Sequence, residues 1–206
     1  LVGGTAGRTT LNGEGLQHQD GHSHILAQTI PSCKAYDPAY GYEMAVVVQH
    51  GIKEMFQDNQ NVFYYLTIEN ENYEQPAMPK DCEDGIIKGM YKYESVETKG
   101  RKKSPRVQLL GAGAIMNEVR EAAQMLKDDW GVASDVWSVT SYNELAREGQ
   151  AAERLKLHAL GGEAEDAYVE NMLAARKGVF VAASDYQKAL PLSIERWVPG
   201  PFAVLG

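Results

Sequence analysis

The sequence predicts an α/β protein built in two parts, and three observations support this. Short β-favouring segments alternate with longer segments whose apolar residues recur at helical spacing, an order typical of parallel sheets covered by helices. The alternation is interrupted once, at residues 70–84, by a polar stretch that holds Pro76 and Pro79 and is typical of a domain crossing. The 206 residues are 44% hydrophobic, which is enough to bury a substantial core.

The first part is predicted to be a loop followed by one strand–helix–strand unit. Residues 1–24 are rich in Gly, Thr, His and Gln without a regular period, which indicates a structured loop. We expect a short strand over residues 30–36 and a helix that begins at Asp37–Pro38, because Asp favours the N-cap and Pro the first helical turn. Apolar residues continue this helix over residues 39–56, and residues 62–68 then favour a buried strand.

The second part alternates strands and helices more regularly. A strand-like segment at residues 89–96 leads into the basic run 99–103, Lys-Gly-Arg-Lys-Lys, where a solvated turn is favoured over a site for an anionic partner. Four further strands alternate with helices, which predicts a doubly wound sheet. The expected strands are residues 107–110, 133–139, 179–183 and 202–205, and the expected helices are residues 117–128, 143–158, 163–176 and 186–197.

Charge and cysteine content disfavour several classes of protein. The net charge of −8 disfavours binding to nucleic acid or to an anionic membrane surface, and no apolar run is long enough to span a bilayer. Cys33 and Cys82 fit neither a metal-site spacing nor a disulfide framework, so we expect both to be reduced, as in the cytoplasm. The chain starts in mid-motif, with neither an initiator Met nor a signal peptide, so we expect a longer parent protein.

The strongest candidate for a functional site is residues 13–24, Gly-Glu-Gly-Leu-Gln-His-Gln-Asp-Gly-His-Ser-His. Three histidines lie close together, but no further ligand stands at a standard metal-site spacing. Gly21 also disfavours a helix that would align His18 with His22, so a metal site is disfavoured. Two interpretations remain equally open: imidazoles that act in acid–base or substrate-binding chemistry, and a polar loop whose imidazoles satisfy backbone groups.

Three other segments follow predicted strands, where sites in α/β proteins form. Residues 110–116, Leu-Gly-Ala-Gly-Ala-Ile-Met, begin like a dinucleotide fingerprint, but Met116 replaces the third glycine, so a plain tight turn is favoured. Residues 67–73 carry carboxylates and amides and are favoured as a solvated loop over a substrate site. Ser138 and Ser141 lack the flanking glycines of a nucleophile elbow.

Residues 13–24 closely resemble the decarboxylating first component of the homodimeric bacterial pyruvate dehydrogenase complex. The resemblance continues through segments that are distributed over nearly the whole chain, and such collinear agreement is far more specific than one motif. These segments are residues 30–31, 36–40, 70–73, 76–79, 107–111, 119–123, 134–136, 138–141, 144–147 and 182–186.

The resemblance implies a domain plan and a set of cofactors, because this family shares the layout of transketolases. Residues 1–78 would be the end of a pyrimidine-binding parallel-sheet domain, and residues 79–206 would be most of a transketolase-like C-terminal doubly wound domain. The implied cofactors are thiamine diphosphate and Mg²⁺, which in this family are anchored mainly by segments that precede Leu1. The cofactor-binding residues of this chain therefore stay unassigned, and none of its residues is expected to ligate the metal ion.

The resemblance also implies the reaction, its partners and its residues. Thiamine diphosphate would decarboxylate pyruvate in a cytoplasmic homodimer, and the acetyl group would pass to the lipoyl domain of the dihydrolipoyl acetyltransferase component. His18 corresponds to a family histidine close to the reacting carbon and is expected to contact the substrate-derived carboxylate or hydroxyl. Asp20 and His24 match the substrate-facing Asp-Gly-x-x-His pattern of transketolases. Glu14 matches a carboxylate near the channel between the paired cofactors.

Two other functions stay open beside this one. Without the segments that anchor the cofactors, these residues would serve as a non-catalytic dimerisation or interaction fragment of the same enzyme. The weaker alternative is an independent metal hydrolase that uses His18, His22 and His24 as ligands.

Overall fold

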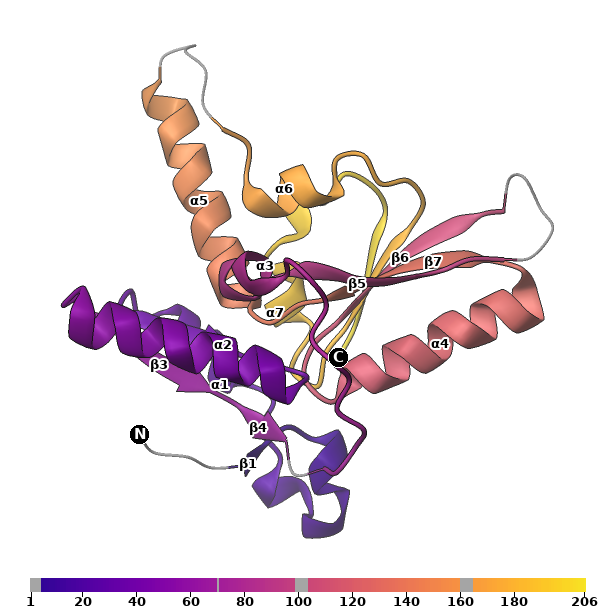
Figure 1. Cartoon of the computed structure of the whole chain (residues 1–206), viewed down its shortest axis with the longest axis horizontal. Coiled ribbons are helices and arrows are strands. Elements are labelled where there is room, and N and C mark those ends of the chain that lie inside the picture. Colours follow the sequence, from indigo (N-terminus) through magenta and orange to yellow (C-terminus); the bar gives the residue numbers. More distant parts are fainter. Residues whose placement is uncertain (1–4, 70, 99–103, 160–164) are drawn as a thin grey trace.

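The computed structural model describes residues 5–69, 71–98, 104–159 and 165–206. Figure 1 shows a first part with helices α1 and α2 and a second part with a twisted five-stranded sheet. The α/β class predicted from the sequence is confirmed. No helix in the described residues is both long enough and apolar enough to cross a membrane.

The first part contains two pairs of parallel strands. Strand β2 (Cys33–Tyr36) pairs with β3 (Phe63–Leu66). Helix α2 (Gly41–Ile52), extended by a π-helical turn at Lys53–Gln57, forms the crossover between them, as parallel strands require. The second pair consists of β1 (Thr5–Ala6) and β4 (Ile68–Glu69).

Helix α2 begins at Gly41 rather than at Asp37–Pro38, so the predicted start is wrong. Asp37 does not cap the helix, because its carboxyl Oδ1 accepts a hydrogen bond from Thr67 Oγ1 at 2.6 Å. Its backbone N–H donates to the carbonyl of Thr140 in the second part at 2.8 Å. The capping group is Glu43, whose Oε2 accepts hydrogen bonds from the backbone N–H groups of residues 39 and 40 at 2.6 and 3.1 Å. A capping box of this kind satisfies donors that a helix start leaves free.

Two short helices lie in segments that the sequence predicted to be irregular. Helix α1 (Ser23–Gln28) begins within the predicted loop, because the Asp20 carboxylate accepts hydrogen bonds from backbone N–H groups at its start. Two 3-10 turns precede it, at Thr9–Glu14 and Leu16–His18. Helix α3 (Glu83–Lys88) lies at the end of the predicted crossing.

The second part is a five-stranded sheet with the order β5-β7-β6-β8-β9. The four strands from β6 onward are parallel, whereas β5 runs antiparallel to β7 at one edge. All five overlap segments that the sequence predicted as strands, although it did not predict the direction of β5. They are β5 (Tyr91–Val96), β6 (Arg106–Gly111), β7 (Ala133–Ser138), β8 (Phe180–Ala183) and β9 (Phe202–Leu205).

Helices cover both faces of this sheet. Leu109 of β6 packs in a cluster with residues of α4 (Ile115–Trp130). Its neighbour Leu110 packs in another cluster with residues of α5 (Tyr142–His158), because successive side chains of a strand point to opposite faces. Figure 1 shows α4 and α5 on different sides of the sheet. The predicted doubly wound arrangement is therefore confirmed.

The later helices are shorter than predicted. Helix α6 covers Tyr168–Leu173. Residues 186–197 form helix α7 (Ala189–Leu192) and a 3-10 turn at Glu195–Trp197 instead of one helix, because Pro191 has no N–H with which to continue a longer helix. The basic run 99–103 lies outside the described residues.

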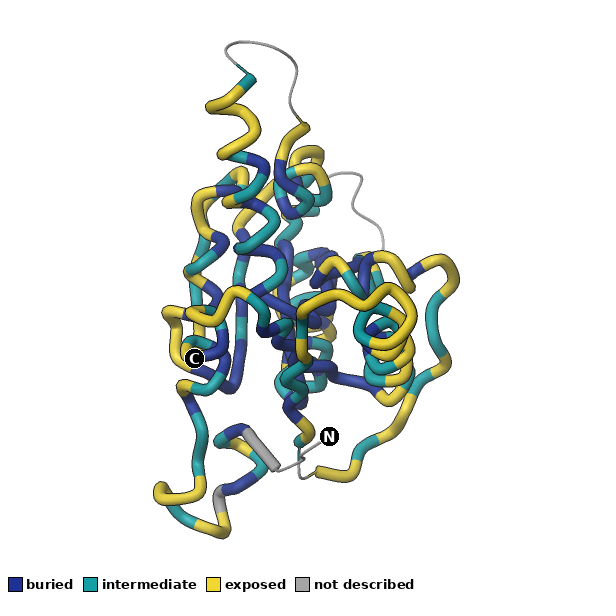
Figure 2. The backbone as a smooth tube through the Cα atoms, turned by 90° about the vertical axis from the view of Figure 1, so that its left-hand side faces the viewer, coloured by how far each residue is buried: buried dark blue, intermediate teal, exposed yellow. Residues whose placement is uncertain are grey.

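The two parts of the chain are joined by buried hydrogen bonds. Ser138 Oγ and Tyr91 OH donate to Glu43 Oε1 at 2.6 and 2.7 Å. Ser141 Oγ donates to the Ala35 carbonyl at 2.6 Å. Glu43 is fully buried, so its carboxylate holds α2 against β5 and β7. Figure 2 shows the buried backbone concentrated in the middle of the molecule, where this joint and the sheet lie.

We expect Glu43→Ala to lower the free energy of unfolding by about 3 kcal/mol, because it leaves several buried donors without an acceptor. The measurement is urea denaturation followed by tryptophan fluorescence. Glu118→Ala removes an exposed glutamate from α4 and should change stability by less than about 0.5 kcal/mol. Equal losses in the two variants would contradict the role given to Glu43.

Candidate functional site

The histidine loop, residues 7–24, lies across the carboxyl end of β8, the edge of the sheet where sites in α/β proteins form. Asp185, directly after this strand, accepts hydrogen bonds from Arg8 N at 2.5 Å and from Thr9 Oγ1 at 2.6 Å. The backbone N–H of Gln187 donates to the Gly21 carbonyl at 3.1 Å. The loop is therefore anchored to the second part of the chain near both of its ends.

His18 and Glu14 lie together on the exposed side of this loop. His18 Nδ1 is 3.9 Å from Glu14 Oε2, and the two side chains are 56% and 49% exposed. Glu14 ends the first 3-10 turn and His18 ends the second, and Gly15 joins the two turns in a non-helical conformation. An exposed imidazole next to a carboxylate can bind an anionic or hydroxyl group and can move a proton.

The Asp20 carboxylate holds the loop in place by accepting two backbone hydrogen bonds. Its Oδ1 accepts from His22 N at 2.9 Å and from Ser23 N at 3.0 Å. Burial raises the pKa of Asp20, but the hydrogen bonds from Ser23 and His22 outweigh burial and leave that pKa below its usual range. The carboxylate therefore stays ionised at neutral pH and fixes the start of α1. His22 Nε2 lies 2.6 Å from Gln187 Nε2, so His22 and His18 are not arranged to bind one metal ion together.

His24 is buried, at 3% exposure, in an aromatic pocket. Its ring packs edge-on against Tyr186, with the ring centroids 4.6 Å apart. Its Nε2 lies 3.0 Å from Thr67 Oγ1, which donates to Asp37 Oδ1 at 2.6 Å. When Asp37 is ionised, the single hydroxyl hydrogen of Thr67 is used toward Asp37, and His24 Nε2 then donates to Thr67. Burial lowers the pKa of His24 to about 4, so the ring is neutral at pH 7.

Three carboxyl groups lie beneath the loop, and two of them, Asp37 and Glu69, have poorly compensated charges. Burial, together with their mutual repulsion, raises the pKa of Asp37 to about 7 and that of Glu69 to about 8. Asp185 is the third member of this group. Asp37 Oδ2 and Glu69 Oε1 are buried without a hydrogen-bond partner in the described part of the chain. Groups that titrate near neutral pH can hold and release a proton during a reaction.

Sequence reasoning did not select these acids as site residues. It assigned Asp37 to a helix cap and favoured a solvated loop for residues 67–73, yet Thr67 is 1% exposed and Glu69 is partly buried. The available signal was position, because Asp37 and Thr67 follow the paired parallel strands β2 and β3 at an edge that commonly forms sites.

The glycine-rich turn after β6 serves packing. A Cβ at Gly113, where φ is +52°, would lie 2.7 Å from Asp37 Oδ2, and a Cβ at Gly111 would lie 3.0 Å from Met116 Sδ. The space beside Gly113 is thus filled by a carboxyl group, which would repel a phosphate. This favours the tight turn over a nucleotide site. The hydroxyls of Ser138 and Ser141 donate hydrogen bonds that join the two parts of the chain. This structural role agrees with the absence of a nucleophile motif around them.

Two family models match the chain. The family described as Pyruvate dehydrogenase E1 component middle domain matches residues 1–76, and the Transketolase-like TK C-terminal domain matches residues 89–206. The chain belongs to the pyruvate dehydrogenase E1 family of transketolase-like proteins. The Pyruvate dehydrogenase E1 components of Pseudomonas aeruginosa, Haemophilus influenzae and Escherichia coli are 54%, 53% and 51% identical to it along its whole length. The chain spans 23% of the length of each of these relatives.

Transketolases of known structure share the fold of this E1-family chain. The Campylobacter jejuni enzyme superimposes with a TM-score of 0.63 over 98% of the chain and 26% of its own length. The Leishmania mexicana enzyme gives a TM-score of 0.60 over 94% of the chain and 23% of its own length. At 16% identity in both cases, this likeness concerns the fold alone.

The buried His24 should make stability depend on acidity. Its pKa is about 4 when folded and about 6.5 when unfolded, so protons bind preferentially to the unfolded chain between these values. Stability from this group is therefore complete above about pH 6.5 and is lost as the pH falls toward 4, by about 3 kcal/mol. The measurement is urea denaturation at pH 7 and pH 4.5. The stability gap between wild type and His24→Gln should shrink at the lower pH, whereas the gap for the exposed His158→Gln should stay constant.

Proposed function

We propose that this chain is part of a thiamine-diphosphate-dependent pyruvate dehydrogenase, which decarboxylates pyruvate and transfers the acetyl group to a lipoyl domain. The supporting observation is the similarity to Pyruvate dehydrogenase E1 components along the whole chain, with 54% sequence identity to the one from Pseudomonas aeruginosa. The exposed pair of His18 and Glu14 on a loop over the strand ends fits this role. The proposed partners are the dihydrolipoyl acetyltransferase component, which carries the lipoyl group, and a second copy of the enzyme.

We place the domain boundary at residues 78 and 79. The two family matches end at residue 76 and begin at residue 89, which supports a crossing between them. No helix or strand lies between β4 and α3 in the described residues, as expected of a connection between domains. The first domain would bind the pyrimidine ring of the cofactor, and the second would be transketolase-like.

The residues of this chain fit one wall of a cofactor site. We assign Mg²⁺ and the pyrophosphate group to other segments of the full-length enzyme, as the family layout implies. When bound, thiamine diphosphate would supply a nucleophilic carbon and an electron sink for the decarboxylation of pyruvate.

The residues of the loop divide into two roles. His18 donates a hydrogen bond to the substrate-derived carboxylate or hydroxyl and moves a proton there, while Glu14 orients its imidazole from 3.9 Å. Asp20 and His24 are positioning residues, because Asp20 caps α1 and His24 is buried against Thr67. The buried free cysteines Cys33 and Cys82 suit a reducing compartment, and we place the enzyme in the cytoplasm.

We expect His18→Ala in the full-length enzyme to lower kcat about 10²-fold or more, because a positioned acid–base group is lost. The measurement is pyruvate-dependent reduction of ferricyanide with saturating thiamine diphosphate and Mg²⁺. His22→Ala is the matched control from the same loop and should retain most of its turnover. Unchanged turnover in His18→Ala would show that His18 does not act in the reaction.

The 206 residues of this chain should not reduce ferricyanide with pyruvate by themselves, even with both cofactors added. The full-length enzyme should do so and should require thiamine diphosphate and Mg²⁺. Activity of the 206-residue chain alone would contradict the assignment of cofactor binding to other segments. Equal affinity of thiamine diphosphate for the two proteins, measured by calorimetry, would contradict it as well.

A further inference from the structure

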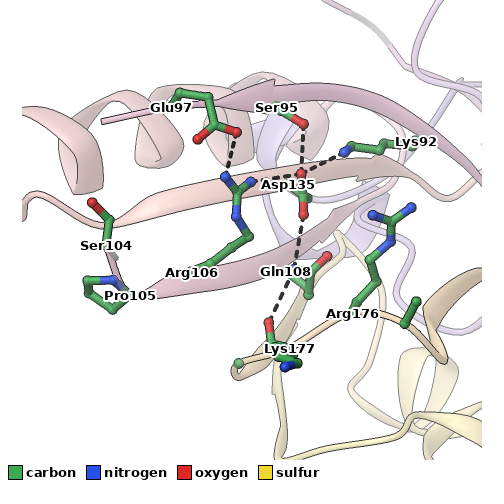
Figure 3. Close-up of a pocket in the computed structure, with 12 residues that line it drawn as sticks. Lys92, Ser95, Glu97, Ser104, Pro105, Arg106, Gln108, Asp135, Arg176 and Lys177 are labelled. Carbon is green, nitrogen blue, oxygen red and sulfur yellow. Dashed lines mark hydrogen bonds and ion pairs between the residues drawn. The ribbon is translucent and has the colours of Figure 1, made fainter. Parts of the chain in front are cut away.

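A cavity of about 650 Å³ opens at the opposite end of the five-stranded sheet. It lies where β6 begins at Arg106, whereas β6 ends at Gly111, next to the turn that contacts Asp37. Five residue steps of strand separate these two ends by roughly 16 Å. Figure 3 shows that side chains of β5, β6 and β7 and of the loop before β8 surround the cavity. The cavity is therefore separate from the site proposed for pyruvate.

One fully buried amide, Gln108, organises the floor of this cavity. Its Nε2 donates to Asp135 Oδ2 at 3.2 Å and to the Lys177 carbonyl at 3.3 Å. Its Oε1 accepts from Trp137 Nε1 at 3.0 Å. These bonds connect two strands and the loop before β8, so the floor is held in place without a ligand.

The loop 175–178 is held against β6 at very close range. A Cβ at Gly178, where φ is +102°, would collide with the carbonyl oxygen of Arg106, so only glycine fits. The Arg176 guanidinium lies over the Trp137 ring, with its Cζ 5.4 Å from the ring centroid. Its Nε is buried and has no hydrogen-bond partner among the described residues. The loop therefore presents this guanidinium to the cavity in a defined orientation.

Four cationic side chains and two carboxylates line the cavity. Asp135 Oδ1 pairs with Lys92 Nζ at 2.7 Å and with Arg106 at 3.0 Å, and Arg106 also pairs with Glu97 at 2.5 Å. Burial raises the pKa of Asp135, but the hydrogen bonds and charges around it outweigh burial and lower that pKa to about 2. Both carboxylates are thus matched by Lys92 and Arg106, and two positive charges remain.

Arg176 and Lys177 supply those two charges, since neither forms an ion pair with any residue that the structure describes. In Figure 3, Asp135 lies between the guanidinium groups of Arg106 and Arg176. A phosphate monoester carries a charge of about −1.5 to −2 at neutral pH, which matches the surplus, and a planar guanidinium can bind two of its oxygens. We propose that this cavity binds the phosphate group of a small anion through Arg176 and Lys177.

Isothermal titration calorimetry of the full-length enzyme tests this proposal. The protein is first saturated with thiamine diphosphate and Mg²⁺, so that its cofactor site does not take up the probe. We expect saturable binding of inorganic phosphate or glycerol 3-phosphate with a Kd of about 1 mM or lower, and weaker binding of malonate. Tighter binding of glycerol 3-phosphate identifies a phosphorylated metabolite as the source of the phosphate, and tighter binding of inorganic phosphate identifies the free ion.

Variants connect this binding to the cavity. The double variant Arg176→Gln, Lys177→Gln should weaken phosphate binding about 10-fold or more through the loss of charge-assisted hydrogen bonds. Lys177→Gln alone changes an exposed side chain and serves if the double variant does not fold. Arg154→Gln removes an exposed arginine from α5 and should bind phosphate as the wild type does. The proposal is overturned by a lack of saturable binding, by equal affinity for malonate, or by unchanged affinity in the Arg176 and Lys177 variants.

Discussion

The joint between the two parts of the chain depends on hydrogen bonds to the segment from Asp37 to Glu43. The N–H of Asp37 donates to the Thr140 carbonyl at 2.8 Å, and its own carbonyl accepts from Gly113 N at 3.1 Å. Glu43 then accepts bonds from both parts through one buried carboxylate. A buried polar group without its partner costs about 1–3 kcal/mol. These bonds therefore hold the segment, and the elements attached to it, against the sheet.

The histidine loop takes its position from the same segment. Thr67 joins Asp37 to His24, and Asn143 Nδ2 of α5 donates to the His24 carbonyl at 2.9 Å. The exposed His18 is thus connected, through a short length of loop, to a buried network that spans both parts. Residues 13–24 therefore contain both a residue that holds the loop in place, His24, and a residue whose side chain is exposed, His18.

The pKa values of two aspartates, one at each end of the sheet, are shifted in opposite directions. Asp37 and Asp135 both have little exposed surface, at 4% and 3%, but Asp37 lies deeper in the protein than Asp135. The pKa of Asp37 is raised to about 7, because burial and neighbouring carboxylates oppose its charge. Burial raises the pKa of Asp135, but hydrogen bonds from Lys92, Ser95 and Gln108, together with the charge of Lys92, outweigh burial and lower that pKa to about 2. Depth of burial, hydrogen bonds and neighbouring charge together decide whether such a group can exchange protons near neutral pH.

The sequence by itself determined the α/β class, the family, and the succession of the second part's strands and of most helices along the chain. These features depend on local periodicity and on motifs read in order. The sequence could not determine that β5 runs antiparallel, that α2 starts at Gly41, or that His24 is buried while His18 is exposed. The direction of β5 and the burial of His24 depend on partners far along the chain. The start of α2 depends on a local capping box at Glu43 and on Thr67, which holds the Asp37 carboxyl elsewhere. Periodicity reports which face of one element is apolar, whereas only tertiary packing decides which polar groups meet, and therefore which of the histidines supports the loop and which can reach a substrate.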